Sequence, residues 1–183
     1  GHKTLYGPTG ISGFVMNPDV TLKPVFFGGT GYDSANQDMP SSLPERFEMG
    51  TMNSSGIAGL NAALRWIDQT GIEVIAKKEE ENRNRLIDLL GRYDFVQLVG
   101  AREDRQYVGV VSTLIDGISS DSCGSLFDRL GIAVRTGLQC APLAHKFLGT
   151  FPAGTVRFSV SFFTTDEDYL ELERALTYIK DNL

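Results

Sequence analysis

The sequence predicts an α+β protein, in which helices cover one sheet and a loop-rich segment precedes them. Residues 1–53 are crowded with Gly, Pro, Ser and Thr, which is typical of loops around short strands. From Gly56 onward, apolar residues recur at helical spacing in several stretches, with short strand-like runs between them. The resulting order is helix, helix, strand, strand, helix, strand, strand, helix, which favours a layered α+β fold. We therefore expect two parts, residues 1–53 and 54–183.

The first part offers one strand-like run, Gly13–Met16. The second part opens with an amphipathic helix that starts near Gly56 and stops at Gly71, a residue type that commonly ends helices. Its apolar positions are Ile57, Leu60, Leu64 and Ile67.

A second helix is expected over Ile72–Leu90, because Ile75, Leu86, Leu89 and Leu90 are apolar there. The run Lys77–Arg85 is almost wholly polar, and we interpret it as a solvated face. Strands are predicted over Phe95–Val99 and Tyr107–Ile115, which are rich in apolar and β-branched residues.

The last elements are a helix over Ser119–Leu130 closed by Gly131, a short strand Ile132–Val134, a strand Thr155–Phe162 and a final helix. Thr155–Phe162 alternates, with Val156, Phe158, Val160 and Phe162 on one face and Arg157, Ser159 and Ser161 on the other. The final helix opens at Thr165, before three acidic residues that suit a helix N-terminus. Its inward stripe is Leu172, Leu176, Ile179 and Leu183.

The composition excludes several classes of function. The chain has 183 residues, a net charge of −6 and a pI near 4.9, and clustered Lys and Arg are missing, so we expect no nucleic-acid partner. Its apolar runs fall far short of a bilayer span, so no membrane partner is expected, and no metal-ligand set is predicted. With two cysteines and no targeting pattern, we expect a cytoplasmic protein. The opening without Met suggests a chain cut from a longer one.

The opening segment GHKTLYGPTGISG places Lys3 beside His2 and a glycine-rich turn. A lysine is poorly used in a core, and these glycines weaken any helix or strand. A backbone that approaches a bulky ligand closely would explain both features. A solvent-exposed lysine beside a turn is the alternative.

The segment GIAVRTGLQCAPLAHK places Cys140 on a turn or loop between Gly137 and Pro142. Arg135 and His145 flank it in the sequence, and cationic neighbours lower the pKa of a thiol. An incidental loop cysteine is the alternative. Cys123 lies within a helical pattern, and we interpret it as a small packing residue.

The segment GTVRFSVSFFTT projects Arg157 from the polar face of an otherwise apolar strand. An arginine can hold a carboxylate through two parallel hydrogen bonds, which lysine cannot reproduce. A salt bridge at a sheet edge is the alternative.

Together with RFEMGTMNSSGIAGLNAAL, these three segments resemble the C-terminal half of the class V aminotransferase family, and most closely its cysteine desulfurase and selenocysteine lyase branch. The similarity runs along essentially the whole chain, in order. It implies a fold-type I pyridoxal-phosphate (PLP) transferase with α/β architecture. Residues 1–53 would then be a remnant of the large PLP-binding domain, and residues 54–183 the C-terminal small domain.

The resemblance also implies roles for individual residues. Lys3 corresponds to the lysine that binds PLP covalently, and His2 to a residue that helps to hold its phosphate. Thr51, in FEMGT, corresponds to a threonine that reaches the phosphate of the other subunit's cofactor. Cys140 corresponds to the catalytic cysteine. The two arginines, Arg157 and Arg135, correspond to the residue that grips the substrate carboxylate and to a second residue of that pocket.

The implied reaction converts L-cysteine, or selenocysteine, to alanine, with a persulfide formed on Cys140. A homodimer and a sulfur-acceptor protein are the implied partners. The family residues that contact the PLP ring and most of its phosphate would lie N-terminal to Gly1, so we expect this fragment alone to be inactive. Gln139 stands where desulfurases often carry a histidine.

Two alternatives stay open. One is another class V PLP aminotransferase or lyase, in which Cys140 is not catalytic. The other is a non-catalytic interaction or dimerisation module that retains the fold without the cofactor domain.

Overall fold

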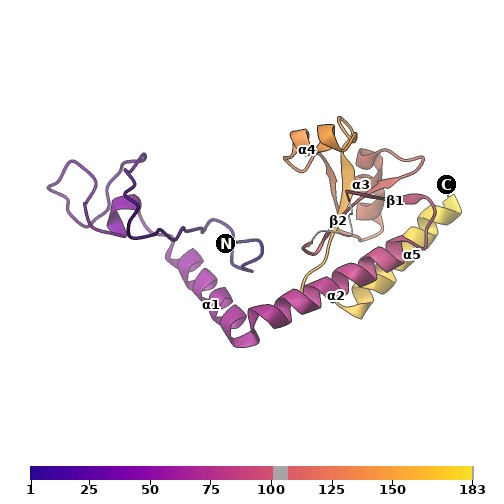
Figure 1. Ribbon diagram of the computed structural model, residues 1–183, viewed down its shortest axis with the longest axis horizontal. Coiled ribbons are helices and arrows are strands. Elements are labelled where there is room, and N and C mark those ends of the chain that lie inside the picture. Colours follow the sequence, from indigo (N-terminus) through magenta and orange to yellow (C-terminus); the bar gives the residue numbers. More distant parts are fainter. Residues whose placement is uncertain (101–106, 183) are drawn as a thin grey trace. The chain divides into compact units, whose positions relative to one another are not determined.

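The computed structural model describes residues 1–100 and 107–182, which form an α+β arrangement, as the sequence predicts (Figure 1). They divide into two compact units, Gly1–Gly71 and Ile72–Leu183, and each unit is described by itself. The first helix is grouped with the first unit, whereas the sequence-based boundary lies between residues 53 and 54. The assignment of the two parts to a large and a small domain of a longer protein stays a prediction.

The first unit consists mainly of loops, with a 3-10 turn, η1 (Glu45–Phe47), and one α-helix, α1 (Ser54–Thr70). The predicted strand Gly13–Met16 is wrong. Its residues belong to no strand, and Phe14 and Val15 are largely exposed. A strand needs a neighbour for its backbone hydrogen bonds, and the described residues of this unit form none.

Helix α1 has well-defined ends. The side chain of Asn53 accepts a hydrogen bond from the backbone N–H of Gly56 at 3.0 Å, which satisfies a free donor at the helix start. At the other end, Gly71 adopts a φ of 89°, and its N–H donates to the carbonyl of Ile67 at 2.9 Å. The predicted stop at Gly71 is therefore confirmed.

The N-terminal loop packs on α1. The rings of Tyr6 and Trp66 meet edge to face with centroids 5.4 Å apart. Farther along, a Cβ atom on Gly59 would lie 2.8 Å from the ring of Pro8, so the helix and the loop are in close contact there. This packing holds residues 1–11 in a defined place on the first unit.

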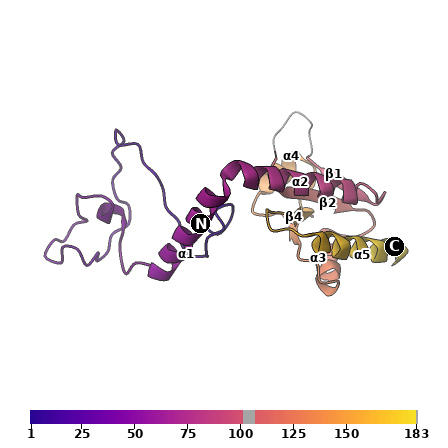
Figure 2. The same cartoon turned by 90° about the horizontal axis from the view of Figure 1, so that it is seen from below.

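The second unit is built on a four-stranded sheet, in which every neighbouring pair is antiparallel (Figures 1 and 2). The order of the strands across the sheet is β1-β2-β4-β3. Their bounds are β1 (Val96–Val99), β2 (Val110–Ile115), β3 (Arg135–Gly137) and β4 (Thr155–Ser159).

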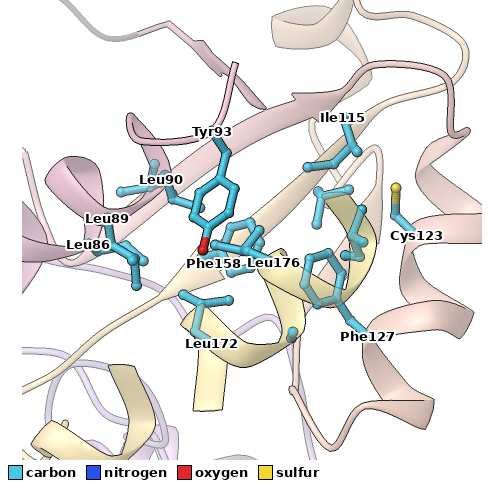
Figure 3. Close-up of a cluster of buried hydrophobic side chains, with 14 of the residues drawn as sticks. Leu86, Leu89, Leu90, Tyr93, Ile115, Cys123, Phe127, Phe158, Leu172 and Leu176 are labelled. Atoms are coloured by element: carbon cyan, nitrogen blue, oxygen red, sulfur yellow. The ribbon is translucent and has the colours of Figure 1, made fainter. Parts of the chain in front are cut away.

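Helices α2 (Ile72–Leu90), α3 (Ser120–Arg129) and α5 (Asp166–Asn182) cover one face of this sheet and enclose the hydrophobic core (Figure 3). Leu90, Phe127 and Leu176 are fully buried there, and the ring of Phe127 meets that of Phe158 edge to face at 5.4 Å. Burial of each such side chain contributes about 1.5–3 kcal/mol to folding. The core therefore fixes one face of the sheet. The opposite face carries Arg135 and Arg157.

Helix α5 starts as the sequence predicts. The carboxylate of Asp168 accepts hydrogen bonds from the backbone N–H and the hydroxyl of Thr165, at 2.7 and 2.9 Å. The predicted inward stripe is confirmed for Leu172, Leu176 and Ile179, which are buried. Leu183 lies outside the described residues.

The predicted strands differ from the observed ones at their ends. The strand predicted at Ile132–Val134 is wrong, because the N–H of Ile132 closes the preceding helix by donating to the carbonyl of Phe127 at 2.9 Å. Pairing with β4 starts only at Arg135. In the same way β2 begins at Val110, since the N–H of Gly109 donates to the Glu79 carboxylate at 2.6 Å.

Two further differences concern α4 and α2. Helix α4 (Pro142–Phe147) was not predicted, because six residues are too few for a helical period to stand out. The polar run in α2 is not wholly solvated, since Asn82 is buried and its side chain donates to the carbonyl of Ser161 at 2.8 Å. None of the helices in residues 1–100 and 107–182 is both long and apolar enough to cross a bilayer.

Candidate active site

The residues singled out from the sequence fall into two groups. His2, Lys3 and Thr51 belong to the first unit, and Arg135, Cys140 and Arg157 to the second.

Lys3 lies exposed on a turn of the N-terminal loop. Its carbonyl accepts a hydrogen bond from the backbone N–H of Tyr6 at 2.9 Å, and the N–H of Gly7 donates to the carbonyl of Gly1 at the same distance. His2 is exposed beside it. The turn thus presents a lysine amine and an imidazole side by side in the sequence, on a loop that is anchored to α1.

Two glycines of this loop, Gly1 and Gly7, have a packing role that the sequence did not reveal. A Cβ atom on Gly1 would lie 2.7 Å from the carbonyl oxygen of Ile11, and one on Gly7 would lie 2.8 Å from a methyl carbon of Leu60. These glycines therefore allow the loop to approach itself and α1 closely, which accounts for them without a ligand.

Thr51 is exposed two residues before the cap of α1. The cap residue Asn53 also donates from its side-chain amide to the carbonyl of Gly10 at 3.1 Å. One residue before Thr51, the N–H of Gly50 donates to the carbonyl of Gly29 at 2.7 Å. Hydrogen bonds of residues on both sides of Thr51 therefore hold this segment in place, and one of them connects it to the loop that carries Lys3.

Arg135 and Arg157 are direct cross-strand partners in the β3–β4 ladder. Directly opposite residues in an antiparallel pair project from the same face, so the two side chains lie on the face away from the core. Arg157 is half-buried, and its Nε atom is buried without a hydrogen-bond partner. Among the residues that the structure describes, neither guanidinium forms an ion pair.

This pairing bears on the alternative of a salt bridge at a sheet edge. Strand β4 is an inner strand of the sheet, between β2 and β3, and Arg157 faces another arginine instead of a carboxylate. Like charges placed directly opposite each other are unfavourable. The arrangement suits the binding of an anion that neutralises both.

Cys140 is exposed at the tip of the loop between β3 and α4. It has a φ of 61° and follows Gln139, which has a φ of 44°, so both residues adopt the left-handed conformation. The other cysteine, Cys123, is buried in the core, and this burial raises the pKa of its thiol to about 11. The predicted difference between the two thiols, one accessible and one packed, is confirmed.

The imidazole of His145 belongs to a hydrogen-bond network, and its role as a cationic neighbour of Cys140 stays a prediction. His145 is buried, and its two ring nitrogens are engaged by Thr150 Oγ1 at 2.7 Å and by Gln139 Oε1 at 3.1 Å. The side-chain amide of Gln139 donates in turn to the carbonyls of Arg135 and Thr155, at 3.3 and 3.2 Å. Sequence reasoning missed this network, for which the only signal was the concentration of polar residues within a short apolar stretch.

The base of the Cys140 loop is closed by two glycines. A Cβ atom on Gly154, just before β4, would lie 2.2 Å from the carbonyl carbon of Gly137, the last residue of β3. No other residue type fits such a backbone approach. Residues 138–153 therefore leave and rejoin the sheet at one point.

The sequence model of the class-V aminotransferases matches residues 1–172. A probable cysteine desulfurase of Xylella fastidiosa is 33% identical over 97% of this chain and 42% of its own length. The apo structure of a cysteine desulfurase from Thermococcus onnurineus superposes with a TM-score of 0.73 and 29% identity, over 87% of this chain and 40% of that one.

A third neighbour, a mutant of a protein named C-DES, has glycine covalently linked to the PLP cofactor. It has a TM-score of 0.58 at 21% identity, over 72% of this chain and 31% of its own, which indicates a shared fold. The chain thus spans less than half the length of these relatives. The family match over residues 1–172, together with the sheet-and-helix fold that carries the two arginines and the exposed thiol, places this chain in the class-V aminotransferase family.

Proposed function

We propose that the full-length protein is a PLP-dependent cysteine desulfurase that converts L-cysteine to L-alanine and leaves the sulfur on Cys140. The observation that carries this proposal is the placement of Cys140. Its thiol is exposed, and it follows the strand whose first residue, Arg135, stands opposite Arg157. The similarity to cysteine desulfurases along nearly the whole chain supports the same reaction.

The side chains of the first unit fit a phosphorylated aldehyde cofactor. A primary amine, an imidazole and a hydroxyl are exposed there, on Lys3, His2 and Thr51. Lys3 would hold PLP through its aldehyde, and His2 and Thr51 would contact its phosphate. When bound, PLP supplies an electron sink that stabilises negative charge on the α carbon of an amino acid.

The arginine pair would bind the carboxylate of L-cysteine. A guanidinium can donate two parallel hydrogen bonds to a carboxylate, and the buried, unpartnered Nε of Arg157 leaves a donor in need of an acceptor. Arg135, directly opposite, would contribute a second positive charge to the same anion. The carboxylate would thus relieve the repulsion between the two arginines.

Cys140 would act as the nucleophile. Its thiolate attacks the sulfur of L-cysteine, so that a sulfur–sulfur bond forms and the bond between that sulfur and the β carbon breaks. The electron pair of the broken bond stays with the carbon skeleton, which is protonated and released as alanine. Lys3, once its amine is free, is the base and acid for the α proton. The product on the enzyme is a Cys140 persulfide.

The remaining assignments concern the protein as a whole. We place it in the cytoplasm, as a homodimer in which Thr51 of each subunit contacts the cofactor of the other, with a thiol-bearing protein as the sulfur acceptor. Light scattering on the full-length protein measures the assembly. A monomer that still turns over cysteine would contradict the shared site.

The test of the function is the measurement of alanine, persulfide and sulfide from L-cysteine with the full-length protein, PLP and a thiol reductant. Alanine and reductant-releasable sulfide should appear in equal amounts, and Cys140→Ala should abolish both. If Cys140→Ala keeps near wild-type turnover of cysteine, the protein is another PLP aminotransferase or lyase of the family. If PLP does not bind at all, the protein is a non-catalytic interaction or dimerisation module.

A further inference from the structure

The backbone at Cys140 is held in an unfavourable conformation. Gln139 and Cys140 have φ values of 44° and 61°, in the left-handed region that residues with a Cβ atom rarely adopt. Two consecutive residues of this kind persist only where surrounding contacts hold them. The turn has one hydrogen bond of its own, from the N–H of Ala141 to the carbonyl of Leu138 at 2.8 Å. Because the side chain of Cys140 is exposed, further contacts have to come from the side chain of Gln139.

Gln139 supplies them, and its hydrogen bonds fix how its side chain is oriented. Two of its four hydrogen-bond partners are the backbone carbonyls of Arg135 and Thr155, which can only accept a hydrogen bond. The amide nitrogen of Gln139 must therefore point at them, and it lies 3.3 and 3.2 Å from their oxygens. The amide oxygen then accepts from the hydroxyl of Thr155 at 3.2 Å. This one side chain therefore ties the thiol loop to both β3 and β4.

The orientation of Gln139 also sets the state of His145. An amide oxygen cannot donate, so the Nε2 atom of His145, 3.1 Å away, must carry a hydrogen. The other nitrogen, Nδ1, is paired with the hydroxyl of Thr150 at 2.7 Å, and both His145 and Thr150 are buried. His145 is thus a fixed donor that holds the amide of Gln139 in place from the α4 side.

We propose that Gln139 and His145 form a positioning pair, which holds Cys140 in its left-handed conformation next to the strands that carry Arg135 and Arg157. The pair deepens the proposed function, because the thiol it fixes is the one assigned to accept sulfur. The hold on the loop itself does not depend on that assignment. Neither residue touches the reacting atoms, so both act through the backbone of Cys140.

The test compares variants of the full-length protein by hydrogen exchange of the amides of residues 138–141. Gln139→Ala removes all the hydrogen bonds of this side chain. Gln139→Glu keeps an acceptor oxygen but turns a second oxygen toward two carbonyls. His145→Leu removes the donor, whereas His145→Gln retains an N–H group at a similar reach. Gln97→Ala, on the exposed side of β1, is the matched control.

Exchange at residues 138–141 should become about tenfold faster or more in Gln139→Ala, Gln139→Glu and His145→Leu, since several hydrogen bonds that oppose local opening are lost. His145→Gln and Gln97→Ala should stay close to the wild type. Amides of the core helix residues 86–90 should be unchanged in all of them. With L-cysteine, kcat for persulfide formation should fall about tenfold in Gln139→Ala while KM changes less than twofold, because the arginine pair is intact.

Unchanged amide exchange at residues 138–141 in Gln139→Ala would overturn the proposal. An equal increase in the exchange rate of the core amides 86–90 would also overturn it, because Gln139 would then stabilise the whole unit and not the loop in particular. If amide exchange at residues 138–141 becomes equally faster in His145→Gln and His145→Leu, His145 acts by packing and not as a hydrogen-bond donor, and the proposed pair is wrong. If the wild type turns over no cysteine but the loop amides respond as expected, the desulfurase function fails and the positioning pair stands.

Discussion

Arg135 and Arg157 stand directly opposite each other on β3 and β4, with both side chains on the face of the sheet away from the core. Two cations in this position disfavour the folded state unless an anion lies between them. Arg135→Gln should therefore raise the free energy of unfolding by about 0.2–1 kcal/mol, measured by urea titration without added anions. The same variant should raise KM for L-cysteine in the full-length protein.

The control for this prediction is Arg129→Gln, which removes one positive charge from an exposed position on α3. It should leave KM unchanged and should not stabilise the protein. A loss of stability in Arg135→Gln would mean that the arginine contributes more by packing than it costs by repulsion.

Replacement of Arg157 by lysine tests whether the site needs a planar, two-pronged donor. Arg157→Lys keeps the charge but loses the paired hydrogen bonds, so KM for L-cysteine should rise about tenfold or more. Steady-state kinetics with the full-length protein measure this. A KM within twofold of the wild type would show that only charge matters at this position.

The two cysteines should differ in reactivity. Iodoacetamide at pH 8 should label the exposed Cys140 and spare Cys123, whose pKa of about 11 and burial keep it protonated and inaccessible. Mass spectrometry of the native chain identifies the labelled peptide. Cys140→Ala should lower persulfide formation by about a thousandfold or more, as expected for loss of a covalent nucleophile. Cys123→Ala should cost about 1 kcal/mol of stability and leave the activity unchanged.

Lys3 should be the residue to which PLP becomes attached. Incubation of the full-length protein with PLP, followed by borohydride reduction and digestion, should give a mass increase on the peptide that contains Lys3. Lys3→Ala should lose this increase and the activity together. Modification of Lys23 instead, an exposed lysine of the same unit, would contradict the assignment.

The contact between Arg85 and Asp166 should make stability depend on pH. The hydrogen bond from Arg85, together with the attraction of its charge, lowers the pKa of the Asp166 carboxyl. A group whose pKa is lower in the folded state stabilises that state above its unfolded pKa of about 3.9 and loses this effect as the pH falls further. The wild type should thus unfold at higher urea concentration than Asp166→Asn at pH 7, and the difference should shrink below about pH 3.9.

The control is Asp181→Asn, which removes one carboxylate near the other end of α5. If the difference between the wild type and Asp166→Asn does not change with pH, the ion pair is not responsible for it.

The long elements could be predicted from the sequence because their own residues determine them. The helices α1, α2, α3 and α5 all show a repeated apolar face, and Gly71, Gly131 and Thr165 mark ends that the structure confirms. In each case the signal is local, so no knowledge of distant residues is needed.

The strand ends depended on distant groups. Gly109 is excluded from β2 because Glu79, on α2, takes its N–H, and Ile132 is excluded from β3 because it closes α3. Asn82 was predicted to be solvated for the same reason, since its hydrogen-bond partner, Ser161, is far along the chain. Hydrogen bonds of this kind leave no periodic trace in a sequence.

The candidate site shows the same division. The accessibility of Cys140 and the placement of Arg157 on the face away from the core were predicted from neighbouring residue types. The engagement of His145 by Gln139 and Thr150 was not, because it depends on how the loop folds. Which of these residues act in catalysis stays a prediction.

Because Gly137 and Gly154 approach each other closely, sequence changes within the loop and sequence changes at its base should have different effects on the structure. Residues 138–153 form a loop with a narrow neck, so insertions or exchanges within the loop alter what surrounds the thiol while the spacing of the arginines on the strands is preserved. A side chain at position 154, in contrast, would force the neck open and shift both strands at once. The neck makes the thiol loop an exchangeable module on a constant pair of strands, and Gly154 is the position of the neck at which a Cβ atom does not fit.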